Sequence, residues 1–196
     1  RKETEHLLGK SFSDTLIIAS QKKYVLYSDD ERLRSYAKSE YGIDGVWTQL
    51  LLMELLKEKI ITDDDYNLAT VKIVNSNYYY TMINNRIIYR AGKEVKWDIN
   101  NPMLVKMLDL LSEDNTDYIS GGSVAVEFFY LLWADNSIPN ENKKKITSHT
   151  ISVLIRKRER KIEILGNLKK LIEKFFIARP FVKEEIMAII EELLAS

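Results

Sequence analysis

The fold of this chain is decided by the stretch Tyr24-Val25-Leu26-Tyr27-Ser28-Asp29-Asp30, in which a short apolar run ends in two acids. Its brevity and its β-prone residues are typical of a buried parallel strand. A helix capped by Ser13 or Asp14 is expected before it, and Leu33 and Ala37 mark a helix after it. Strand and helix therefore alternate, which predicts an α/β fold with carboxylates at a strand end.

The next segments predict a second short strand and more helices. Gly42 is expected to end the helix that follows the acids, and Val46-Trp47 is short enough to be a strand or the entry to a helix. Leucines spaced along residues 47–59 predict that helix. The run Tyr78-Tyr79-Tyr80-Thr81-Met82-Ile83 is β-prone by composition. Residues 1–92 are thus expected to form a helix-rich α/β portion with a small parallel sheet.

A domain boundary is predicted where the hydrophobic pattern weakens, from about Gly92 to Asn100. Pro102 fits the first turn of a new helix, and apolar residues at helical spacing continue to the C-terminus. We therefore expect residues 93–196 to form a C-terminal helical bundle.

Composition restricts the chemistry. Lys+Arg and Asp+Glu number 29 each, cysteine is absent, and the only histidines are His6 and His149. Thiolate zinc sites are excluded and other transition-metal sites are disfavoured, so a bound metal is expected to be a hard cation held by oxygen. Neither a secretory leader nor an uninterrupted apolar run long enough to span a membrane is found, which predicts a cytoplasmic protein.

The stretch Asp14-Thr15-Leu16-Ile17-Ile18-Ala19, together with Val25-Leu26-Tyr27-Ser28-Asp29-Asp30-Glu31-Arg32-Leu33-Arg34, resembles the second half of a PIN domain. The resemblance covers roughly residues 10–90. It is strongest to bacterial PIN modules at the C-terminal end of multidomain proteins, where a helical tail follows. It implies a small parallel α/β nuclease fold in which carboxylates hold Mg²⁺ or Mn²⁺ and an activated water cuts RNA.

Carried onto this sequence, the resemblance implies that Asp14 and Asp30 are catalytic and that Asp14, Asp29 and Asp30 hold the metal. The family also uses a first-strand aspartate and a helical glutamate that come earlier, and thirteen residues before Asp14 are too few to supply them. The nuclease site is therefore expected to be incomplete here. Because the chain begins at Arg1, we expect a fragment of a larger polypeptide, whose upstream domains would be partners.

Each of these acids also has a purely structural interpretation. Asp14 caps one helix and Ser28 or Asp30 caps the next, because a side-chain oxygen satisfies the free backbone N–H groups there. The acidic run Asp63-Asp64-Asp65 after Thr62 is better explained as a capped helix N-terminus than as a metal site. The function of the carboxylates thus depends on whether they converge in space.

A basic segment, residues 141–174, carries eleven cations and four acids, a net charge of +7 (11 − 4). Such a segment could follow an RNA backbone, although ordinary solvation of a helix surface is favoured. Asp109 and nearby acids offer these cations partners within the chain. His149 and Glu127 are more readily explained as polar helix positions than as catalytic groups.

Two functions from different classes remain. The first is a PIN-like, divalent-metal-dependent RNA endonuclease module. The second is a noncatalytic helical module whose apolar faces dock onto the parent protein or onto a second copy. No glycine-rich phosphate loop and no Ser/His/Asp arrangement indicates a further enzyme class.

Overall fold

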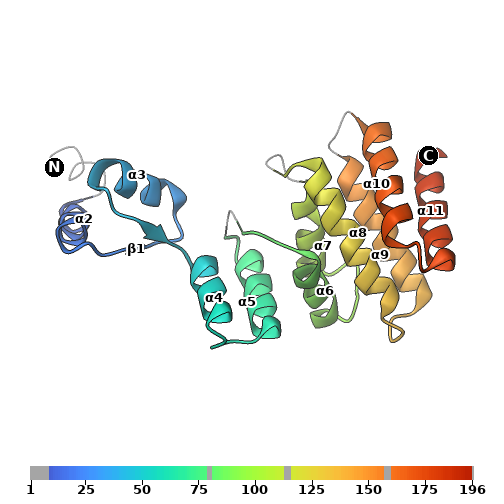
Figure 1. Cartoon of the computed structure of the whole chain (residues 1–196), viewed down its shortest axis with the longest axis horizontal. Coiled ribbons are helices and arrows are strands. Elements are labelled where there is room, and N and C mark those ends of the chain that lie inside the picture. Colours follow the sequence, from blue (N-terminus) through green and yellow to red (C-terminus); the bar gives the residue numbers. More distant parts are fainter. Residues whose placement is uncertain (1–8, 79–80, 113–115, 157–159, 196) are drawn as a thin grey trace. The chain divides into compact units, whose positions relative to one another are not determined.

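A computed structural model describes residues 9–78, 81–112, 116–156 and 160–195. Helices dominate the described residues, and the two short strands there form one parallel sheet (Figure 1). The helix-rich character predicted from the sequence is confirmed. The predicted PIN-like α/β architecture is not, because the described residues are mostly helical and their sheet has two strands of two residues each. The chain divides into two compact units, Arg1–Tyr66 and Asn67–Ser196, called unit 1 and unit 2 below.

Unit 1 is built around a single strand–helix–strand crossover. Its elements are α2 (Lys10–Lys22), β1 (Leu26–Tyr27), α3 (Glu31–Tyr41), β2 (Gly45–Val46) and α4 (Thr48–Lys57), followed by the start of α5 (Asp63–Asn75). The strands pair in parallel, with Leu26 opposite Gly45 and Tyr27 opposite Val46. The predicted short parallel pairing is therefore present, at two residues a strand.

The core of unit 1 is small. Leu16 and Ala19 of α2 pack with Ala37 of α3 and with Ile43, and these four residues are buried. By contrast, Tyr24, Val25 and Tyr27 are more than half exposed. The prediction of a buried strand is wrong at these positions, because no further layer among the described residues covers that part of β1.

The helix termini of unit 1 can be compared with the caps predicted from the sequence. α3 ends at Gly42, whose left-handed φ of 65° makes glycine the favoured residue there. α5 begins with a capping box, in which Asp65 N–H donates to Thr62 Oγ1 and Thr62 N–H donates to the Asp65 carboxylate. The predicted cap at Ser13 or Asp14 is wrong, since α2 already begins at Lys10 with Gly9 before it.

Unit 2 is a bundle around α8. After the rest of α5 it contains α6 (Asn85–Glu94), α7 (Pro102–Asp109), the 3₁₀ turn η1 (Leu110–Ser112), α8 (Tyr118–Ala134), α9 (Asn140–Arg156), α10 (Lys161–Phe175) and α11 (Pro180–Ala195). α8 packs against α6, α9 and α10, while α11 lies against α9 and α10 (Figure 1). Phe128, Phe129 and Leu132 on α8 are fully buried. The bundle thus gathers its apolar helix faces on one central helix.

The break between the units lies earlier than the boundary expected at 92/93. α6 belongs with unit 2 because its buried face, which includes Ile88 and Ala91, packs on α7 and α8. The predicted strand over residues 78–83 falls partly outside the described residues, which exclude Tyr79 and Tyr80. Tyr78 and residues 81–83 form no regular secondary structure.

Candidate functional site

Asp29 joins the end of β1 to the start of α4. One carboxylate oxygen accepts the backbone N–H of Thr48 at 2.8 Å, and the other accepts the Thr48 hydroxyl at 2.8 Å. Thr48 is the first residue of α4, so the carboxylate lies at the positive end of that helix. Asp29 therefore satisfies a helix terminus that Trp47, the formal N-cap residue, leaves without a side-chain acceptor.

Asp30 caps α3. Its Oδ1 accepts the backbone N–H groups of Arg32 at 2.9 Å and Leu33 at 3.2 Å. The Asp30 N–H in turn donates to the Ser28 hydroxyl at 3.1 Å. The capping interpretation of Asp30 is confirmed, and its contacts account for the polar ending of the apolar stretch at residues 28–30.

Asp14 lies within α2 and is half-buried. Its neighbour Ser13 is fully buried, and the Ser13 hydroxyl has no hydrogen-bond partner among the described residues. The structure thus places Asp29 and Asp30 side by side at the C-terminal end of β1 and Asp14 on a different element of the same unit. Within residues 9–78, 81–112, 116–156 and 160–195, no group of three or more His, Asp or Glu side chains is arranged to hold a metal ion.

Two residues that the sequence analysis did not assign stabilise this end of the sheet. Arg34 Nη1 donates to the Ser28 carbonyl oxygen at 2.8 Å, and its guanidinium lies 4.8 Å from the centroid of the Trp47 ring. The contact is a cation–π interaction between α3 and the residue before α4. This contact could not be predicted from sequence spacing, because the parallel crossover alone brings the two residues together.

The basic segment is engaged largely with acids of its own unit. Arg156 pairs with Asp109 at 2.7 Å, as the sequence suggested, and Lys144 pairs with Glu185 at 2.5 Å. Further pairs join Lys145 to Glu141 and Lys169 to Glu191. Residues 157–159 lie outside the described residues. These ion pairs favour the solvated-surface interpretation of the segment over an RNA-binding one.

Lys143 differs from the other cations of the segment because it is buried. Its ammonium lies 5.9 Å from the centroid of the Trp133 ring and 3.5 Å from the Trp133 carbonyl oxygen. Nearby, Tyr89 donates to Asp135 at 2.5 Å. Hydrogen bonds from Ser137 and Tyr89 hold the pKa of Asp135 down to about 2, and burial together with Asp135 raises the pKa of Tyr89 to about 12. The cluster fixes the α8–α9 connection.

The other two polar positions considered from sequence are half-buried helix residues. Glu127 on α8 lines an open hollow with Tyr130, Lys174 and Phe175. His149 on α9 has its Nε2 atom buried without a hydrogen-bond partner among the described residues. His149 lines an open hollow of about 560 Å³ together with Ser148, Ser152 and Glu185. Its Nε2 atom makes no hydrogen bond to them, so its role as a helix position is the better explanation.

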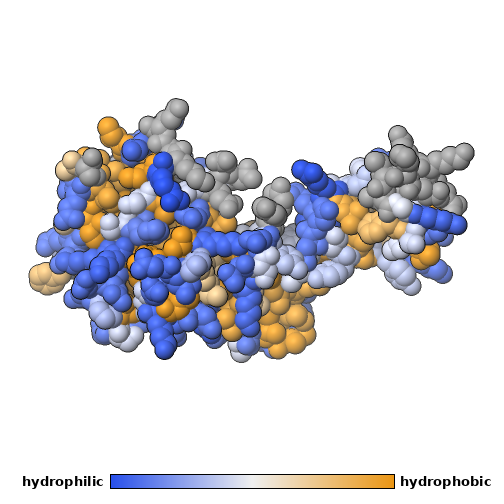
Figure 2. Space-filling model, turned by 180° about the vertical axis from the view of Figure 1, so that it is seen from behind, coloured by the Kyte–Doolittle hydropathy of each residue, from blue (hydrophilic) through white to orange (hydrophobic). Residues whose placement is uncertain are grey.

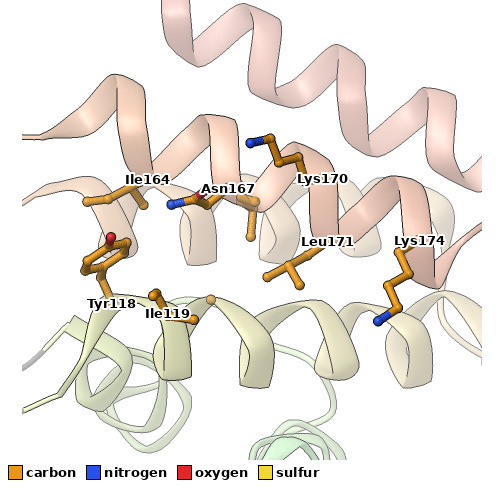
Figure 3. A pocket seen from close by; sticks show the side chains of 9 residues that line it. Tyr118, Ile119, Ile164, Asn167, Lys170, Leu171 and Lys174 are labelled. Carbon is orange, nitrogen blue, oxygen red and sulfur yellow. The ribbon is translucent and has the colours of Figure 1, made fainter.

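A groove of about 320 Å³ runs along the seam of α8 and α10. Tyr118 and Ile119 line it from α8, and Ile164 and Leu171 line it from α10 (Figure 3). Lys174 points toward α8, whereas the amine of Lys170 points away from it (Figure 3). The groove is apolar with one cation at its end, and it brings together no set of catalytic groups.

The most unusual surface of unit 1 is α4. Six of its ten residues are Leu or Met, yet Gln49 is its one buried residue in the described part of the chain. Gln49 donates to the Tyr66 hydroxyl at 3.2 Å. Leu51 and Met53 are exposed, and Ile60 just beyond the helix is 69% exposed. The predicted helix is confirmed, but its leucine stripe does not form its buried face.

A membrane-crossing helix is absent from the part of the chain that the structure describes, since none there combines the necessary length and apolar character. Comparison with known proteins assigns no relative. No family model matches the sequence, and no curated protein or solved structure matches it significantly.

Proposed function

We propose that this chain is a noncatalytic helical interaction module, in which unit 1 docks onto another protein surface through exposed apolar side chains. One observation carries the proposal: the polar Gln49 is 1% exposed while the leucines beside it on α4 are not buried. A helix of an isolated domain normally buries its apolar stripe and exposes its polar face. The arrangement of α4 is the one expected of a helix that completes its packing in a complex.

The surface around α4 supports the proposal. Figure 2 shows apolar surface gathered over the segment that Figure 1 labels α4. Leu51 is 43% exposed and Met53 is 38% exposed, and Ile60 extends the same apolar segment past the helix. Contiguous exposed apolar side chains mark protein–protein contacts more often than scattered ones do.

The proposal is tested by replacing Leu51 and Ile60 with lysine together. Sedimentation equilibrium over a wide protein concentration range would show self-association of the natural chain and weaker association of the double variant. Because both side chains are exposed, the free energy of unfolding should change by no more than about 0.5 kcal/mol per site. Association that is unchanged in the double variant, or a large loss of stability in the variant, would contradict the proposal.

A second candidate is the metal-dependent RNA endonuclease suggested by the PIN-like sequence. The observation in its favour is the position of Asp29 and Asp30 after a parallel strand, since α/β folds place their sites at the carboxyl ends of strands. Carboxylate oxygens suit Mg²⁺ or Mn²⁺. Within this proposal, Asp14 and Asp30 take the catalytic roles and Asp29 assists in holding the metal.

The nuclease proposal is tested by measuring RNA cleavage. Cleavage of single-stranded RNA would be measured with Mn²⁺ and with EDTA, for the natural chain and for Asp30→Asn. Asparagine caps helices about as well as aspartate, so this variant keeps α3 while it removes the charge. Asp44→Asn is a control, because Asp44 is an exposed acid paired with Lys38. Metal-dependent cleavage lost in Asp30→Asn and kept in Asp44→Asn would replace the interaction proposal.

A further inference from the structure

The groove between α8 and α10 is widened by a glycine that packing does not require. Gly122 lies inside α8 and lines the groove, and a Cβ atom there would come no closer than 4.0 Å to Leu171 Cδ1. At the preceding residue, Gly121, a Cβ atom would lie 2.5 Å from the Leu111 carbonyl oxygen. Close packing therefore explains Gly121 but not Gly122. Because glycine inside a helix is less favourable than alanine, the open space at Gly122 indicates a use for the groove.

The groove is apolar and partly enclosed. Ile164 and Leu168 of α10 are 5% and 2% exposed and form its buried wall, and Leu171 continues that wall. Ile119 of α8, at 55% exposure, forms the opposite rim. The volume of about 320 Å³ lies at the lower end of the range of small-ligand sites. A small ligand with an apolar body fits this space.

The two ends of the groove carry opposite charges. At one end, the Tyr118 hydroxyl donates to Glu163 Oε1 at 3.0 Å. At the other end, Lys174 points toward α8 (Figure 3) and has no ion-pair partner among the described residues, although Glu127 lines the adjoining hollow with it. The nine described residues that line the groove itself include no acid. An anionic group is therefore favoured at the Lys174 end and opposed at the Glu163 end.

These features favour an unbranched apolar chain with one anionic end. Glu163 and Lys174 are separated along α10 by about 17 Å, at 1.5 Å per residue. A helix is about 10–12 Å thick with its side chains, at least as wide as the spacing of two packed helices, so it would rest on the groove without entering it. We infer that the α8–α10 groove binds a fatty acid, whose acyl chain lies along Gly122, Leu168 and Leu171 and whose carboxylate pairs with Lys174. The inference concerns unit 2 and goes beyond the proposed docking of unit 1.

The inference is tested first by isothermal titration calorimetry of the full chain with fatty acids of different length. Decanoate should bind saturably at one site. Octanoate should bind roughly tenfold more weakly, because two buried methylene groups are lost. Acetate, which carries the head group alone, should give no measurable binding. Absence of saturable decanoate binding would overturn the inference.

Filling the space at residue 122 should block the acyl chain. Gly122→Leu should weaken decanoate binding at least about tenfold, and Gly122→Ala should weaken it less, because it adds less volume. Both variants should remain folded, since leucine and alanine favour the helix more than glycine does. Gly166→Leu on α10 is the matched control, because a Cβ atom there meets no atom within 4 Å and Gly166 does not line the groove. Equal decanoate binding in all three variants would overturn the site.

Removing the charge of Lys174 tests the position of the carboxylate. Lys174→Met keeps an apolar side chain and should weaken decanoate binding about three- to fivefold, the range of an exposed ion pair. Binding of the neutral decanol should stay within about twofold, because it has no charge for Lys174 to pair with. Lys170→Met is the control: the Lys170 amine points away from α8 (Figure 3), so decanoate binding should be unchanged. An equal loss for decanoate and decanol in Lys174→Met would contradict the placement of the carboxylate.

The outcomes separate this inference from the proposed docking of α4. The double lysine variant of Leu51 and Ile60 should bind decanoate as the natural chain does, because both residues belong to unit 1. Loss of binding in that variant would move the fatty acid to α4 and overturn the groove. If decanoate does not bind but Gly122→Leu weakens self-association, a second copy covers the groove and the fatty-acid inference is wrong. Decanoate binding that is lost in Gly122→Leu supports the groove whether or not the chain self-associates.

Discussion

The two units of the chain differ in how far they bury their apolar residues. Unit 2 collects fully buried aromatic and branched side chains around α8, among them Phe128, Phe129 and Leu132. Unit 1 buries a cluster made of Leu16, Ala19, Ala37 and Ile43. It leaves Leu51 and Met53 of α4 exposed, together with Tyr24 and Tyr27. The comparison indicates a self-sufficient bundle joined to a unit that is only partly packed.

The difference has a consequence for stability. Burial of apolar surface is the main favourable contribution to folding, and small units bury the smallest fraction of their surface. Unit 1 is therefore expected to open at a lower temperature or denaturant concentration than unit 2. Docking would add the buried area that unit 1 lacks, which is why the interaction proposal places the contact there.

The largest effect is expected from truncating the centre of unit 2. Phe128→Ala removes a ring that is 0% exposed and should lower the free energy of unfolding of unit 2 by about 3–5 kcal/mol. Urea unfolding followed by circular dichroism measures it. A loss below about 1 kcal/mol would mean that the packing around α8 is not the main support of the bundle.

Truncating the core of unit 1 should separate the two units. Leu16→Ala should cost about 2–4 kcal/mol, enough to unfold a marginal unit, while unit 2 remains folded. Hydrogen exchange would show rapid exchange along α2 and α3 and continued protection along α8. Simultaneous loss of protection in both units would contradict their independence.

A smaller effect is expected from the caps at the end of β1. Asp30→Ala should destabilise unit 1 by about 1 kcal/mol, because two helix N–H groups lose their acceptor. Asp30→Asn should restore most of the loss, since the amide oxygen still accepts. Thermal unfolding of unit 1 measures both, and equal stability of the alanine variant and the natural chain would argue against the capping role.

The smallest effect on stability is expected from lowering the pH. The folded pKa of Asp135 is depressed to about 2 by hydrogen bonds from Ser137 and Tyr89. A depressed carboxyl pKa stabilises the fold above the unfolded pKa near 4, and that contribution is lost as pH falls from about 4 to 2. The acid-induced loss in unit 2 should be smaller in Asp135→Asn, as measured by unfolding at pH 6 and pH 3.

Local sequence signals predicted many boundaries well. Gly42, Thr62 and Pro102 sit where a helix ends or begins, because backbone conformation and unpaired N–H groups at helix ends depend on neighbouring residues. The same signals misplaced the start of α2. There the helix continues upstream through Lys10, since tertiary packing of Phe12 and Leu16 outweighs the capping preference of Ser13 and Asp14.

The candidate site was harder to predict than the elements that carry it. The stretch at residues 24–30 indicated that acids follow a strand, and they do. It could not indicate that Asp29 reaches Thr48 or that Arg34 lies over the Trp47 ring. Both contacts join residues that are separated along the chain, and the crossover geometry alone brings them together.

The sequence by itself determined that the chain is rich in helix, where several helices begin and end, and that a short parallel pairing follows residue 24. These depend on interactions between residues close in the chain. Only the tertiary structure decided which apolar residues are covered. Leu51 and Met53 of α4, with Tyr24 and Tyr27, are residue types that often pack in cores and sheets. Their burial depends on whether another surface reaches them, and none of the described residues covers them fully.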